Sequence, residues 1–140
     1  MLLSEITEQG TYGCVVPTPA SLALLEAWAH EHGIPMDDGL HVTILYSRKP
    51  VFTEPLVADH IATPIGFMNL GKALVLKLEC PSLQARHEQL IALGGTHDFD
   101  SYKPHLTIMA DPGEFKPEDM PPVNFGITLN CEVLKPNMPH

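Results

Sequence analysis

Basic residues are scarce in this chain of 140 residues. It has eight lysines and arginines against 17 aspartates and glutamates, which gives a formal net charge of −9. A protein that holds a long nucleic-acid backbone needs a stripe of positive charge to displace the counterions of that backbone. The sequence has no such stripe. We therefore expect no long nucleic acid as a partner, and any phosphate ligand should be small.

Long apolar runs and cysteine pairs are also missing. No run of about 18 apolar residues is present, which argues against a membrane span. The N-terminal stretch contains Glu5 and Glu8 and lacks the basic region of a secretory signal. The three cysteines, Cys14, Cys80 and Cys131, are far apart and form no Cys-x-x-Cys pair. This pattern predicts buried free thiols in a reducing compartment, and hence a cytoplasmic location.

Two short stretches of the chain have almost the same sequence. Residues 41–44 read His-Val-Thr-Ile, and residues 105–108 read His-Leu-Thr-Ile. In an extended strand, alternate side chains share a face. Each stretch therefore predicts a strand with an apolar face for the core and a histidine–threonine pair on the other face.

The rest of the sequence predicts an alternation of strands and helices. Thr18 followed by Pro19 is typical of a helix start, and the apolar spacing predicts a helix over residues 19–32. A second helix should begin at Pro81 and end at the glycines 94–95. Residues 58–61 could form a turn or a short helix. The expected strands are 12–16, 41–47, 65–68 as an edge strand, 71–80, 105–110 and 123–134.

The two motifs belong to a longer internal repeat. A shift of 64 residues superposes Pro17 on Pro81, His41 on His105, Thr43 on Thr107 and Ile44 on Ile108. We expect one α+β domain over residues 1–140, with pseudo-repeats of about 11–68 and 71–135. The two duplicated lobes should be antiparallel-rich sheets with a helix on each outer side. A pseudo-two-fold axis would then place both motifs in one central groove.

These residues resemble the 2H phosphoesterases, whose signature is a pair of His-φ-[Thr/Ser]-φ strands (φ being apolar) on two duplicated α/β lobes. The resemblance covers essentially the whole chain and implies the 2H phosphoesterase (LigT-like) fold. More narrowly, residues 12–15 (Tyr-Gly-Cys-Val) and 41–50 resemble the phage anti-CBASS phosphodiesterases. That family degrades the cyclic oligonucleotides, such as cGAMP, of bacterial antiviral signalling. The resemblance implies a cyclic di- or trinucleotide substrate and, for a phage protein, action in the host cytoplasm.

Two imidazoles that face one phosphate can carry out general acid–base catalysis without a metal or a cofactor. One of His41 and His105 would accept the proton of a ribose 2′-hydroxyl, and the other would protonate the leaving 5′ oxygen. Thr43 and Thr107 would donate hydrogen bonds to the non-bridging oxygens, where charge develops. The pseudo-symmetry leaves both assignments of acid and base open.

Three further residues are candidates for substrate contacts. Tyr12 could stack on a nucleobase, although a single tyrosine often serves packing alone. Glu132 could accept a hydrogen bond from an exocyclic amine, or lie on a solvated strand face with Thr128 and Asn130. Lys103, two residues before His105, could attract phosphate or be near the motif by accident.

Other uses of the histidines and other functions stay open. His30 and His32 fall on different sides of the predicted helix, which disfavours a shared zinc ion, and His87 lies on the apolar side of the second helix. Two other functions are compatible with the sequence. The protein could open 2′,3′-cyclic phosphates on RNA ends or small nucleotides, or it could be a sponge, a protein that binds a nucleotide without cleaving it. The sequence leaves base preference, ring size and oligomeric state undetermined.

Overall fold

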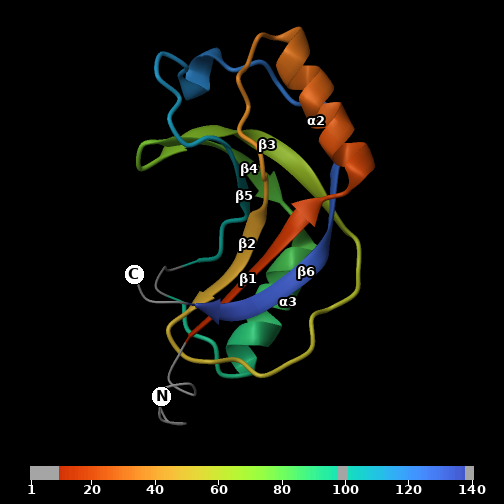
Figure 1. The fold of residues 1–140 in the computed structure, drawn as a ribbon, viewed down its shortest axis with the longest axis vertical. Coiled ribbons are helices and arrows are strands. Elements are labelled where there is room, and N and C mark those ends of the chain that lie inside the picture. Colours follow the sequence, from red (N-terminus) through yellow and green to blue (C-terminus); the bar gives the residue numbers. More distant parts are fainter. Residues whose placement is uncertain (1–9, 98–100, 138–140) are drawn as a thin grey trace.

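The computed structural model describes residues 10–97 and 101–137, which form a mixed α+β fold (Figure 1). Its helices are α2 (Pro19–Glu31) and α3 (Pro81–Ala92), with a short 3-10 helix, η1, at Pro117–Asp119. Among the described residues, no helix is long and apolar enough to cross a membrane. The strands are β1 (Gly10–Pro17), β2 (Val42–Ser47), β3 (His60–Leu70), β4 (Ala73–Glu79), β5 (His105–Met109) and β6 (Ile127–Asn137).

Local signals fix the ends of the helices. Each helix begins with a proline in its first turn, where the missing N–H costs no intrahelical hydrogen bond. The Thr18 hydroxyl accepts a hydrogen bond from the Ser21 N–H at 3.3 Å, so the predicted N-cap of α2 is confirmed. Gly33, with φ 66°, follows the end of α2 in the left-handed conformation that glycine adopts readily.

The six strands form one sheet in the order β2–β1–β6–β3–β4–β5, and every pairing is antiparallel. β1 lies between the motif strand β2 and β6, just as β4 lies between the motif strand β5 and β3. The two halves meet where β3 pairs with β6, for example His60 with Leu129. Repetition of a strand–helix–strand–strand unit would produce this order. We keep the two-lobe duplication as an interpretation of it.

The third strand is longer and more central than we expected. We predicted an edge strand over residues 65–68, but β3 pairs with β6 at one end and with β4 at the other. The segment before it, expected as a turn or short helix, leads into the strand at His60. Pro64 obscured this strand, because proline cannot donate a ladder hydrogen bond. The register shifts between Pro64 and Gly66, and this irregularity accommodates the proline.

The last strand contains a β-bulge that reverses its faces. We expected residues of even number, including Asn130 and Glu132, to share one polar face. Cys131 instead has φ 57°, in the left-handed region, and the register with β1 shifts at this point. Beyond the bulge Glu132 is buried, with 7% of its surface exposed, and Val133 is 46% exposed. The expected face of Glu132 is therefore wrong.

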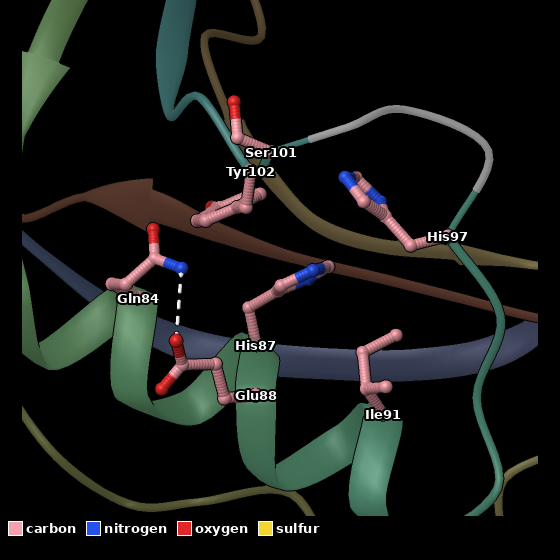
Figure 2. Close-up of a pocket in the computed structure, with 7 residues that line it drawn as sticks. All are labelled: Gln84, His87, Glu88, Ile91, His97, Ser101 and Tyr102. Carbon is pink, nitrogen blue, oxygen red and sulfur yellow. Dashed lines mark hydrogen bonds between the residues drawn. The ribbon is translucent and has the colours of Figure 1, made fainter.

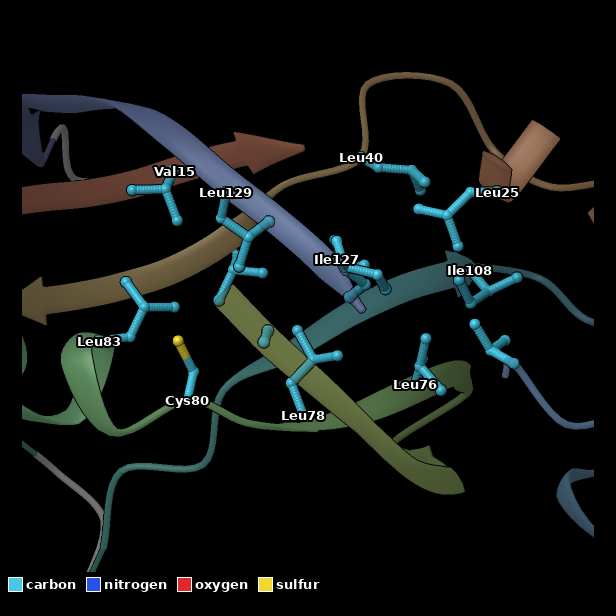
Figure 3. Close-up of a cluster of buried hydrophobic side chains, with 14 of the residues drawn as sticks. Val15, Leu25, Leu40, Leu76, Leu78, Cys80, Leu83, Ile108, Ile127 and Leu129 are labelled. Atoms are coloured by element: carbon cyan, nitrogen blue, oxygen red, sulfur yellow. The ribbon is translucent and has the colours of Figure 1, made fainter. Parts of the chain in front are cut away.

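One hydrophobic core joins both helices to the sheet. Figure 3 shows Leu25 of α2 and Leu83 of α3 among the buried side chains of the strands. The apolar residues of both motifs belong to this core and are fully buried, namely Val42, Ile44, Leu106 and Ile108. The alternation predicted for the two motifs is confirmed, so their histidines and threonines project on the opposite side of the strands.

Candidate active site

The two motif histidines have the same local geometry. The Nδ1 atom of His41 donates a hydrogen bond to the carbonyl oxygen of Gly39 at 3.0 Å. The Nδ1 atom of His105 donates to the carbonyl oxygen of Lys103 at 2.9 Å. A carbonyl oxygen can only accept, so the proton of each neutral ring is on Nδ1. Each Nε2 therefore carries a lone pair that can accept a proton.

Both motif threonines are half-buried on the face of their histidine. The hydroxyl of Thr43 lies 3.1 Å from the Tyr12 hydroxyl, which brings a predicted substrate residue of β1 next to the first motif. Burial raises the pKa of the Tyr12 phenol, while its hydrogen bond to Thr43 acts in the other direction. Tyr12 is thus a neutral phenol at physiological pH and holds the Thr43 hydroxyl in position.

Three hydrogen bonds join the segments that carry the two motifs. The Tyr102 hydroxyl, just before the second motif, donates to the Thr43 carbonyl at 2.7 Å. The Asp37 N–H, just before the first motif, donates to the Ile108 carbonyl at 2.8 Å, and its carboxylate accepts from the Ala110 N–H at 2.8 Å. The curved sheet also brings its edge strands β2 and β5 into contact (Figure 1). Two motifs far apart in sequence therefore lie side by side.

Cationic side chains border each motif. The Lys135 ammonium lies over the Tyr12 ring, 5.5 Å from its centre. Lys103, predicted to attract phosphate, has an exposed side chain, and its carbonyl oxygen is the one that accepts from His105. Lys77 of β4, which was not among the residues predicted from the sequence, is the cross-strand partner of His105. The signal was present: one lysine interrupts the run of apolar residues in that strand.

The Glu132 carboxylate is engaged on the core side of the sheet. It forms a buried ion pair with Arg86 of α3, at 2.8 Å, and accepts a hydrogen bond from the Leu56 N–H at 2.7 Å. Arg86 completes its contacts with the Glu54 carbonyl and the Gln89 side chain. The structure therefore ties Glu132 to α3 and to the loop before β3. Its contact with a nucleobase stays a prediction.

A separate pocket of about 350 Å³ lies beside α3 (Figure 2). Its wall includes His87, which stacks on the Tyr102 ring at 4.4 Å between centres and meets His97 edge-on at 4.6 Å. The His87 Nδ1 donates to the Ile44 carbonyl at 2.7 Å, and burial lowers the pKa of this imidazole. His87 is a neutral buried residue on the apolar side of α3, as the sequence predicted, and its hydrogen bond holds α3 against β2. Among the described residues, no three His, Cys, Asp or Glu side chains gather as metal ligands.

Comparison with known proteins shows which family the chain comes from. The family model described as anti-CBASS protein Acb1 matches residues 9–137, nearly the whole chain. The chain belongs to the Acb1 family. The narrower resemblance seen in the sequence, to anti-CBASS proteins, is therefore confirmed. The wider 2H phosphoesterase assignment stays a prediction.

Relatives in the Acb1 family come from several phages. An anti-CBASS protein Acb1 of Acinetobacter phage Ac42 is 37% identical over 146 aligned residues, which cover 96% of this chain and 91% of that protein. The one from Yersinia phage phiR1-RT is 30% identical, and the aligned residues cover 97% of this chain and 94% of that protein. The one from Vibrio phage KVP40 is 46% identical over 83 residues, and there the match spans 55% of each chain.

Proposed function

We propose that this chain is a metal-independent phosphodiesterase that hydrolyses the 3′–5′ bonds of cyclic di- and trinucleotides, and that it thereby counteracts CBASS antiviral signalling. The observation that carries the proposal is the matched pair of His41 and His105, each held through Nδ1 by a backbone carbonyl. Membership of the Acb1 family supports the anti-CBASS role. The 2H phosphoesterase resemblance supports the chemistry.

The reaction needs one neutral and one protonated imidazole. The neutral histidine accepts the proton of the ribose 2′-hydroxyl at Nε2, and the 2′ oxygen attacks the adjacent phosphorus. The bond from phosphorus to the 5′ oxygen breaks, and the protonated histidine gives its proton to that oxygen. The product carries a 2′,3′-cyclic phosphate, and a second cycle in the reverse sense adds water to give a 3′-phosphate. Both histidines then have their starting protons.

The threonines complete the site. In this proposal the hydroxyls of Thr43 and Thr107 donate to the non-bridging phosphate oxygens, which gain charge in the transition state. Tyr12 contacts the substrate. It also orients Thr43, which is supported by the 3.1 Å distance between the two hydroxyl oxygens. Lys103 draws the anionic substrate toward His105. The low positive charge of the whole chain agrees with a substrate of few phosphates.

A substrate panel separates this function from its alternatives. The protein is incubated in EDTA with cyclic di- and trinucleotides, their 2′-deoxy analogues and a nucleoside 2′,3′-cyclic monophosphate, and the products are separated by chromatography. We expect linear products from the cyclic ribonucleotides and none where the attacking 2′-hydroxyl is missing.

Other outcomes would each point elsewhere. A cyclic oligonucleotide returned intact from a stable complex would indicate a sponge. A strong preference for the 2′,3′-cyclic monophosphate would favour a role on RNA ends or small nucleotides. Activity lost in EDTA and restored by a divalent ion would contradict the two-histidine mechanism.

A further inference from the structure

Two of the eight lysines and arginines lie in β-strands. All eight fall within the described residues. The two that lie in strands are Lys77 in β4 and Lys135 in β6. Arg86 is neutralised by Glu132 in the core, and the remaining cations lie in turns and loops. Lys135 already covers the Tyr12 ring. Lys77 is thus a positively charged residue of the sheet that has no role in the proposed mechanism.

The register of β4 places Lys77 on the face of the second motif. Lys77 is the antiparallel partner of His105 on one side and of Gly66 on the other. Residues opposite each other in an antiparallel pair project to the same face, with Cβ atoms roughly 5 Å apart. Val75, two residues earlier on the same face, is the partner of Thr107. Lys77 and the His105–Thr107 pair therefore share one surface.

The lysine side chain leans away from β5 toward β3. Its Cε lies 3.9 Å from the position that a Cβ atom on Gly66 would occupy. Because Gly66 has no side chain, the lysine stem can lean against β3. The end of the side chain is therefore directed away from the strand of His105. That direction suits a second anionic group better than the phosphate under attack.

The other half of the sheet carries its lysine at a different position, because Lys135 is the partner of Tyr12 and lies over its ring. The β1–β2 pairing ends at Val15 and Val42, and Val16, the next residue of β1 toward His41, is apolar. An apolar side chain in this position cannot bind phosphate. The two halves therefore repeat their histidines and threonines but hold their lysines at different positions, Lys77 opposite His105 and Lys135 opposite Tyr12.

We propose that Lys77 binds the phosphate that is not being cleaved in a cyclic di- or trinucleotide. This inference rests on the proposed function. A cyclic oligonucleotide carries a second phosphodiester across its ring from the scissile one, whereas a nucleoside 2′,3′-cyclic monophosphate carries a single phosphate. Lys77 is thus a specificity-determining residue that favours cyclic oligonucleotides over cyclic mononucleotides.

The test compares two substrates on matched variants. Lys77→Gln removes the charge and keeps a polar side chain one atom shorter, and Lys77→Arg keeps the charge. Lys72→Gln removes an exposed charge from the turn between β3 and β4. For Lys77→Gln we expect KM for a cyclic dinucleotide to rise about tenfold with kcat within about twofold, as for the loss of one charge-assisted hydrogen bond. The KM of the 2′,3′-cyclic monophosphate, or its KI as a competitor, should not change. Lys77→Arg and Lys72→Gln should behave as the wild type.

Three results would overturn the inference. An equal rise of KM for both substrates would place Lys77 at the scissile phosphate. A fall of kcat with unchanged KM would make it part of the chemical step, and wild-type kinetics would remove it from the site. If the wild type cleaves neither substrate, the proposed function fails. Equilibrium binding of the cyclic dinucleotide to the wild type and to Lys77→Gln then still decides whether Lys77 binds it.

Discussion

At the scale of single residues, the backbone decides which nitrogen of each motif histidine faces outward. The carbonyl oxygens of Gly39 and Lys103 accept from Nδ1 of His41 and His105, so the lone pair of each neutral ring is on Nε2. Strand alternation alone predicted that histidine and threonine would share a face, because it holds in any strand. The Nδ1 contacts were beyond reach, since the carbonyls belong to loops whose path depends on the whole fold.

Glu132 shows where residue patterns mislead. Its carboxylate is buried against Arg86 at 2.8 Å, and removing one partner of a buried ion pair leaves the other charge uncompensated. We expect Glu132→Gln to lower the free energy of unfolding by about 3–5 kcal/mol in urea denaturation. Glu88→Gln, on the exposed surface of α3, should change it by less than about 0.5 kcal/mol.

The same variant also tests the earlier interpretation of Glu132. If Glu132→Gln has the unfolding free energy of the wild type but a higher KM for the cyclic nucleotide, the structural role of Glu132 is contradicted. Glu132 would then act on the substrate, as the sequence suggested, and not on Arg86.

At the scale of elements, local sequence signals predicted the helices correctly, but they did not predict the pairing and register of the strands. The helices were predictable because caps, prolines and apolar spacing act within a few residues. The central position of β3 and the bulge of β6 depend on which strands pair, and pairing partners come from distant parts of the chain. Pro64 interrupts the pattern of β3, and the bulge at Cys131 shifts every later side chain of β6 to the other face.

The bulge predicts an unusual response to glycine. Cys131 is exposed and has φ 57°, a conformation that costs a residue with a Cβ atom about 1–2 kcal/mol. We expect Cys131→Gly to raise the free energy of unfolding by up to about 1 kcal/mol, after the greater flexibility of the unfolded chain is subtracted. Val133→Gly, at an exposed position of the same strand, should lower it by about 1 kcal/mol. Destabilisation by both changes would contradict the left-handed conformation at Cys131.

At the scale of the whole molecule, the order of the strands decides what the motifs can do together. β2 and β5 are the two edges of the sheet, yet the sheet curves until they meet, and Tyr102 and Asp37 bond across from one motif segment to the other. The 64-residue repeat predicted two equivalent units, but their meeting depends on the pairing of β3 with β6 in the middle of the sheet. Local sequence patterns cannot predict that pairing, because β3 and β6 are far apart in the sequence.

The central claim is that the two motifs act as one site on one phosphodiester. The most direct test is kcat/KM for a cyclic dinucleotide in EDTA with His41→Ala, His105→Ala and the double variant, and with His30→Ala on the exposed surface of α2 as the control. One composite site predicts that each single change costs about 10³-fold, that the double change costs no more than either, and that the control keeps full activity. Two independent sites would leave about half the rate in each single variant and none in the double, and that result would contradict the account.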